Sequence, residues 1–376
     1  MGLMRKARYL APWHREGVDF SGCGDDEGRV AEALAGLRGK PAIYHCVSRI
    51  VNRDFVLGRE EKEKFVALMR VYARFCQVRV LTFCVMSNHV HILVEVPAAP
   101  EDRGASWTDE ELLGHLECLY SEREMGELRG ELEHYRGHGM AAAAEGFREK
   151  YFARMWDLSA YMKVLKQCFT QWFNRKHGRV GVLWEGRFKS VLVEDGHAAR
   201  TVAAYVDLNP VRAGLVSDPK DYRWSGYGEA VAGKELAREG VRLVVFEKLL
   251  CLKAEELAAE EVVSWRELGH RYRLMLFQEG GRSGGDAKPG CCGISREEVE
   301  RVLAAGGELS EGEMKFCKAR HLVDGLVIGT EGFVNEVYGL TRGYFGKART
   351  SGARKLRRVC TSLRTMRDLQ RDPVSL

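Results

Sequence analysis

Residues 89–96 alternate between an apolar and a more polar set, and this period of two predicts a strand with one apolar face. The apolar set consists of Val90, Ile92, Val94 and Val96. The second set begins with His89 and His91, so both imidazoles are expected to leave the strand on the same side. Side chains at this spacing lie roughly 7 Å apart, close enough to bind one divalent cation together. The alternative is that both histidines are ordinary half-buried residues of a sheet.

The hydrophobic segment 78–85 precedes this strand and has the composition of a strand itself. Ser87-Asn88 separates the two segments and is typical of a tight turn. The pattern therefore predicts a hairpin, with the two histidines just past its bend. A hairpin within a sheet holds its side chains rigidly, which a catalytic metal site requires.

Four further segments accompany the hairpin. Residues 42–49 and 191–193 are predicted strands. Residues 60–76 and 158–175 are predicted amphipathic helices, because their apolar residues recur every three or four positions. A strand, a helix and a hairpin in this order form the opening half of a ferredoxin-like arrangement. The predicted fold is therefore α+β, with a ferredoxin-like antiparallel sheet backed by helices.

The same pattern divides the chain into parts. The predicted parts are an N-terminal extension (1–40) and a core in two pieces (41–98 and 157–228). A helical insertion (99–156) separates the two pieces, and a mainly helical accessory region (229–376) follows the core. A short helix is expected at 30–37, and a helix at 202–208 should end where Asn209-Pro210 follows. The histidines of the insertion are interpreted as surface residues, namely His115, His134 and His138.

The accessory region contains two predicted short helices, at 295–304 and 332–337, which could form a helix-turn-helix module. After them, the segment 341–376 has ten Lys or Arg residues and only two acidic residues. A basic tail of this kind attracts nucleic acid, or is simply a solvated end of the chain.

Composition narrows the class of protein. The formal net charge is +5, and there is no run of eighteen apolar residues that would predict a transmembrane helix. The basic N-terminus lacks the apolar segment of a secretory signal. The eleven cysteines include no Cys-x-x-Cys pair, which disfavours a zinc ribbon or a disulfide framework. We expect a cytoplasmic protein that is associated with the nucleoid and has no membrane partner.

The segment 174–190 interleaves cationic and aromatic side chains, a mixture that binds phosphates and stacks on bases. Its cationic residues are Arg175, Lys176, Arg179, Arg187 and Lys189, and its aromatic residues include Trp184 and Phe188. The segment is therefore a predicted DNA-binding element.

Five blocks of the sequence, taken together and in this order, resemble the REP-associated tyrosine transposases, which are domesticated relatives of the single-tyrosine HUH transposases of insertion sequences. The blocks are Ala42-Ile43-Tyr44-His45, Met86-Ser87-Asn88-His89-Val90-His91, the segment 181–190, the segment 208–216 and Tyr222-Arg223-Trp224-Ser225. The resemblance covers residues 40–98 and 157–228, and it leaves out the insertion and everything after 228.

The resemblance implies an endonuclease and strand transferase that cleaves and rejoins single-stranded DNA at hairpin-forming repeats. In this family a His pair holds Mg2+ or Mn2+ on the scissile phosphate, which assigns that role to His89 and His91. A polar residue of the following helix often completes the metal site, and Asn174 is the candidate, with Gln171 behind it. Arg212, in the block 208–216, joins the predicted DNA-binding residues.

The chain departs from the family at the nucleophile, a helix tyrosine that forms a covalent 5′-phosphotyrosine. The alignment places this tyrosine at position 169, where the chain has Phe169. Tyr161 is on the same helical stripe and is the substitute candidate, although it lies about 12 Å away along the axis. Three possibilities therefore stay open: an active transposase-type enzyme, a hairpin-DNA-binding protein that forms no covalent bond, and a metal-dependent nuclease that uses water.

Overall fold

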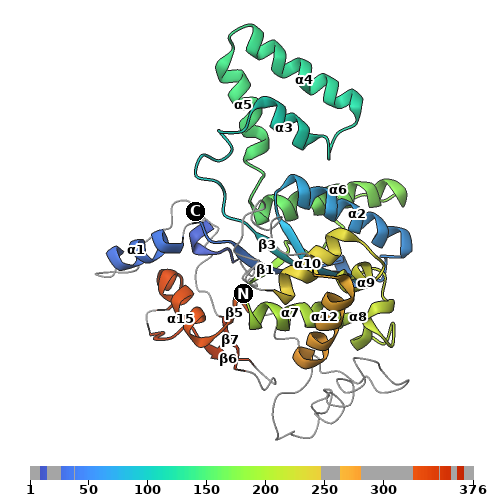
Figure 1. Cartoon of the computed structure of the whole chain (residues 1–376), viewed down its shortest axis with the longest axis vertical. Helices are drawn as coiled ribbons and strands as arrows, with labels where there is room; N and C mark the ends of the chain where they lie inside the picture. The colour runs from blue at the N-terminus through green and yellow to red at the C-terminus, as the bar shows by residue number, and fades with distance from the viewer. Residues whose placement is uncertain are drawn as a thin grey trace, which may run out of the picture. The chain divides into compact units, whose positions relative to one another are not determined.

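The computed structural model describes residues 9–14, 27–37, 39–246, 263–280, 325–346, 348–356 and 362–367 (Figure 1). The chain divides into two compact units. The first unit comprises residues 1–57, 80–95 and 184–376, and the second comprises residues 58–79 and 96–183. Each unit is described by itself.

A single sheet organises the first unit, and its strands lie in the order β2-β3-β1-β4-β5-β7-β6. The strands are β1 (Ala42–Arg49), β2 (Arg79–Val85), β3 (His89–Val96), β4 (Lys189–Val193), β5 (Val327–Gly329), β6 (Arg354–Lys355) and β7 (Arg364–Met366). The first four strands have the order of a ferredoxin-like sheet, and β1 pairs with β4 in antiparallel register, with Ile43 opposite Val193. The predicted α+β fold with this sheet is confirmed.

The sheet continues beyond the predicted core. Strand β4 pairs in parallel with β5, and β5 pairs with β7, which pairs with β6. These three short strands come from the region 229–376, for which the sequence predicted mainly helices. Part of the predicted basic tail is therefore folded into the sheet edge, including Arg354, Lys355 and Arg364.

Seven helices are described in the first unit: α1 (Glu27–Leu37), α7 (His197–Asp207), α8 (Asn209–Arg212), α9 (Gly226–Val231), α10 (Glu235–Val245), α12 (Trp265–Gly280) and α15 (Glu331–Leu340). Helix α7 carries four fully buried alanines, and these small side chains let the helix pack closely against the sheet. Helices α10 and α12 join the same apolar cluster. Helix α15 confirms the helix predicted at 332–337, whereas the helix predicted at 295–304 lies outside the described residues.

A buried carboxylate ties these elements together. Asp207, the last residue of α7, is fully buried and accepts hydrogen bonds from three neighbours. The hydroxyl of Thr82 in β2 donates at 2.8 and 2.9 Å, the hydroxyl of Tyr272 in α12 at 2.5 Å, and the main-chain N–H of Tyr227 in α9 at 3.1 Å. One side chain thus links a strand to three helices.

The second unit contains α2 (Arg59–Phe75), α3 (Asp109–Leu116), α4 (Glu122–Gly137), α5 (Ala141–Phe152) and α6 (Leu158–Lys176). Helices α2 and α6 pack through aromatic rings, with the centroids of Phe65 and Phe169 5.2 Å apart. At the end of α6, Lys176 forms ion pairs with Glu60 and Glu61 of α2. The helices predicted at 60–76 and 158–175 are confirmed.

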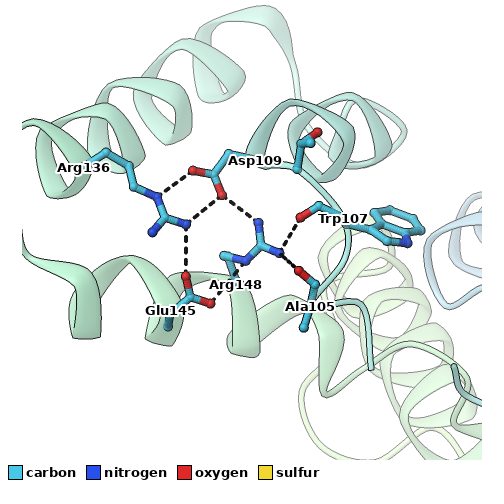
Figure 2. A pocket seen from close by; sticks show the side chains of 7 residues that line it. Ala105, Trp107, Asp109, Arg136, Glu145 and Arg148 are labelled. Atoms are coloured by element: carbon cyan, nitrogen blue, oxygen red, sulfur yellow. Dashed lines mark hydrogen bonds and ion pairs between the residues drawn. The ribbon is translucent and has the colours of Figure 1, made fainter. Parts of the chain in front are cut away.

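The segment 99–156 is helical as predicted, and a buried arginine holds its helices together. Arg148 of α5 is 5% exposed and donates to Asp109 at 2.6 Å and to the main-chain oxygen of Trp107 at 2.6 Å. Arg136 of α4 binds the same carboxylate and also Glu145 (Figure 2). These groups line a polar pocket, but each of them is already engaged by a neighbour, so the pocket is a structural joint between the helices of the segment 99–156. His134 and His138 are exposed as expected, whereas His115 is half-buried and bonded to the main-chain oxygen of Phe75.

Candidate functional site: a histidine cluster in the sheet

His89 and His91 leave strand β3 on the same side, as the alternating pattern predicted. Their ring centroids are 5.0 Å apart, and the ring planes are nearly perpendicular, at 80°. His89 is half-buried, whereas His91 is only 2% exposed. Every residue of β3 after His89 is buried, on both faces of the strand. The predicted contrast between one apolar and one more exposed polar face is therefore wrong.

A third histidine, which the sequence analysis did not assign a role, completes the cluster. His45 of β1 is fully buried, and its Nε2 atom lies 2.9 Å from Nδ1 of His91. The two rings are stacked, with centroids 5.2 Å apart and planes at 19°. Strand β1 lies next to β3 in the sheet, which brings these residues together although 46 positions separate them.

Tyr205 of helix α7 forms one wall of the histidine cluster. Its ring stands edge-on to His91 and His45, with centroid distances of 5.6 and 5.9 Å. The guanidinium carbon of Arg212, a predicted DNA-binding residue, lies 4.8 Å from the centroid of the Tyr205 ring. The structure therefore brings Arg212 to the edge of the same cluster, although nothing in the sequence pattern links this arginine to the histidine pair.

Burial and nearby positive charge keep the imidazoles of His89 and His91 neutral. Burial, and to a smaller extent the positive charge of Arg49, lower the pKa of His89 to about 4. The pKa of His91 is lowered well below its usual value, first by burial and then by the charges of His89, His45, Arg49 and Arg212. Neutral imidazole is the form that binds a metal ion.

The donor set of this cluster fits a cation that keeps open positions. The Nδ1 atom of His89 is hydrogen-bonded to Asn88 at 2.6 Å, and that of His91 to His45. Each of the two rings therefore has its Nε2 atom left for a cation. Among the described residues, no group of three or more His, Cys, Asp and Glu side chains could hold a metal ion. Two nitrogen donors suit Mn2+ better than Mg2+, which prefers oxygen ligands, and both ions leave positions for water or phosphate.

The role of Asn174 as a third metal ligand stays a prediction. Asn174 belongs to the second unit, at the end of α6, and its amide donates to the main-chain oxygen of Gly181 at 2.9 Å. This bond closes the turn after the helix. Gln171, the residue considered behind it, is exposed on α6.

The candidate nucleophile Tyr161 is part of the core of the second unit. Its side chain is fully buried, and its hydroxyl donates to the main-chain oxygen of Met69 at 3.4 Å. Phe169, where the resemblance places the tyrosine of the family, is also fully buried, against Phe65. The burial of Tyr161 contradicts a role in attack on DNA, because a phosphodiester cannot reach a hydroxyl inside a packed core.

The predicted DNA-binding residues differ in their exposure. Arg175, Arg179 and Arg187 are exposed, and Lys189 is half-buried at the start of β4. Arg212 packs against Tyr205, and the last two are engaged within the protein: Lys176 is in its ion pairs with α2, and Trp184 is 8% exposed and forms a β-bridge with Ile50, the residue after β1. The buried Trp184 ring is not presented to stack on a base, nor is that of Phe188, which is 5% exposed.

One family model matches the part of the chain that contains the histidine cluster. Residues 40–101 match a family model described as "Transposase IS200 like", and this range contains all three histidines. The chain is also similar to a solved structure of a REP-associated tyrosine transposase bound to a REP hairpin, at 14% identity and a TM-score of 0.33. The match covers 60% of this chain and 94% of the solved one. None of the curated protein sequences compared with the chain matches it.

Proposed function

We propose that this chain, which contains an IS200-like transposase domain at residues 40–101, is an endonuclease and strand transferase that acts on single-stranded, hairpin-forming DNA. The observation that carries this proposal is the pair of Nε2 atoms on His89 and His91, which share one side of β3 inside the matched range. The ligands of the proposed Mg2+ or Mn2+ ion are these two nitrogens. The cation would supply Lewis-acid polarisation of the scissile phosphate.

Two arginines support binding of a phosphate beside the histidine cluster. Arg49 ends strand β1, and its charge acts on both His89 and His91. Its Nε atom is buried and has no hydrogen-bond partner among the described residues. The guanidinium group of Arg212 packs against the Tyr205 ring, and its charge acts on His91. Guanidinium groups bind phosphate oxygens in a planar, bidentate manner, so both arginines suit the backbone of a DNA strand.

The domain organisation belongs to the same proposal. Residues 41–98 and 157–228 would form the catalytic core, with 1–40 as an extension, 99–156 as an insertion and 229–376 as an accessory region. Among the described helices, none is long and apolar enough to cross a membrane. We place the protein in the cytoplasm at the nucleoid, where its DNA substrate lies.

A second function, hairpin-DNA binding without a covalent step, is favoured by the residues of α6. Phenylalanine at position 169 has no hydroxyl, and Tyr161 is buried. A metal-dependent nuclease that uses water in place of tyrosine is the remaining form of the enzyme.

One experiment separates the three functions. The full chain is incubated with an end-labelled single-stranded DNA hairpin and Mn2+, and the products are run on denaturing and native gels. A protein–DNA adduct that survives denaturation supports the strand transferase. Cleaved strands without an adduct support the hydrolytic nuclease, and a shift on the native gel alone supports the binding protein.

Two variants assign the chemistry. Replacing both His89 and His91 by Ala should abolish cleavage and leave DNA binding in place, because phosphate contacts supply most of the affinity. Cleavage that survives this double substitution would rule out the histidine pair as the metal site. For an adduct, Tyr205→Phe is the informative variant, since Tyr205 is the tyrosine whose ring contacts the histidine cluster.

A further inference from the structure

We infer that His45 is a positioning residue. Its Nε2 atom accepts a hydrogen bond from the Nδ1–H group of His91, and this leaves the Nε2 lone pair of His91 available to a cation. The presence of the cation rests on the proposed function, whereas the tautomer of His91 can be measured in the protein without a cation. The inference rests on two hydrogen bonds, one for each histidine of the pair.

The first bond fixes the tautomer of His89. The amide nitrogen of Asn88 donates to the main-chain oxygen of Arg53 at 3.2 Å, which orients the amide. The Oδ1 atom of Asn88 then faces Nδ1 of His89 at 2.6 Å. A carbonyl oxygen only accepts, so Nδ1 of His89 must carry the proton. Since this ring is neutral, its Nε2 atom has a lone pair.

The second bond joins two imidazole nitrogens, Nδ1 of His91 and Nε2 of His45, at 2.9 Å. One of them must donate and the other accept. If His45 donated, the proton of His91 would sit on Nε2, and that atom could not bind a cation. If His91 donates, both rings of strand β3 have the same tautomer, and both Nε2 atoms are available on the same side.

A histidine is a suitable acceptor at this place in the sheet. Metal-binding histidines usually donate their other N–H to a carboxylate, a carbonyl or water, and this partner sets the tautomer and the ring orientation. His45 is fully buried, where an ionised carboxylate would carry a large desolvation cost. A neutral imidazole accepts the same proton without that cost, and it adds no negative charge that would repel a DNA phosphate.

The tautomers can be read directly from the unliganded wild-type protein. In protein labelled with 15N at its histidines, two-bond proton–nitrogen correlations distinguish the Nδ1–H form from the Nε2–H form. The signals of His91 are identified by their loss in His91→Gln. We expect the Nδ1–H form for His91, for His89 and for His45. The Nε2–H form at His91 would overturn the inference, whatever activity the protein has.

Two substitutions at His45 test its role in metal binding. Gln offers a carbonyl oxygen that can accept the proton, whereas Leu fills the space without an acceptor. Loss of such a partner lowers metal affinity about 10- to 100-fold. We therefore expect weaker Mn2+ binding by His45→Leu, measured by calorimetry or electron paramagnetic resonance, and near-wild-type binding by His45→Gln. Equal affinity in both variants, with thermal unfolding showing that both are folded, would also overturn the inference.

These measurements keep the inference separate from the proposed function. A wild-type protein that binds Mn2+ and has the expected tautomers, but leaves DNA uncut, would contradict the endonuclease and leave the role of His45 standing. A protein that cuts DNA while His91 has the Nε2–H form would contradict the role of His45 alone.

Discussion

At the scale of single residues, a substitution of Tyr161 tests whether the hydroxyl of this α6 residue attacks DNA. Its side chain is fully buried and its hydroxyl donates to the main-chain oxygen of Met69 at 3.4 Å. We predict that Tyr161→Phe leaves cleavage and any DNA adduct unchanged, because its hydroxyl lies inside the core of the second unit, where a phosphodiester does not reach it. The free energy of unfolding should fall by about 1 kcal/mol or less, measured by urea denaturation. A folded Tyr161→Phe protein that no longer forms an adduct would restore Tyr161 as the nucleophile.

The histidine cluster shows which site residues a local sequence pattern can predict. His89 and His91 could be predicted, because a period of two places neighbours at i and i+2 on one side of a strand. His45 could not, since its partner lies on another strand and the strand order is not encoded in local alternation. Tyr205 is contributed by a helix after β4, and only the packing of that helix on the sheet brings its ring to the cluster.

At the scale of elements, Asp207 links β2, α7, α9 and α12, and it makes this junction sensitive to pH. Burial raises its pKa to about 6, and this effect outweighs the hydrogen bonds from Tyr272, Tyr227 and Thr82, which lower the pKa. The ordinary value is 3.8, so the folded state holds this proton more tightly than the unfolded chain does. The contribution to stability is therefore largest below pH 4 and is lost as the pH rises through 6.

The variant Asp207→Asn removes this titration. We predict that, relative to the variant, the wild-type protein loses about 1 to 3 kcal/mol of unfolding free energy between pH 4 and pH 7. Denaturant unfolding of both proteins at several pH values measures the difference. Parallel stability curves would contradict a raised pKa at Asp207. Tyr272→Phe is a matched control, because it removes one hydrogen bond to the carboxylate and leaves the titratable group in place.

Elements with a clear hydrophobic period were the ones the sequence could predict. The two long helices α2 and α6 and the strands β1 to β4 each span enough residues for the pattern to be read. Strands β5, β6 and β7 have only two or three residues each, which is too short for any period. They exist because they pair with β4 and with each other, a tertiary effect that local composition does not record.

At the scale of the whole molecule, the distribution of basic residues bears on the proposed binding of DNA. The formal net charge is only +5, but exposed arginines occur in both units, including Arg175 and Arg179 in the second and Arg187 in the first. The burial of Trp184 and Phe188 removes the two aromatic rings expected to stack on bases. For the proposed binding of DNA, we therefore expect contacts with the phosphate backbone to supply most of the affinity, and such contacts depend strongly on salt.

Binding of a labelled single-stranded DNA hairpin, followed by fluorescence anisotropy at several salt concentrations, tests this view. We predict that Arg187→Ala weakens binding at low salt and reduces the slope of log affinity against log salt by about 0.7, the value for one phosphate contact on a single strand. Arg123→Ala is the matched control: Arg123 is also cationic and exposed, but it lies in α4, outside the predicted DNA-binding segment 174–190. Its removal should leave the slope unchanged. If both variants changed the slope equally, the effect would come from net charge, and Arg187 would have no contact of its own with the DNA.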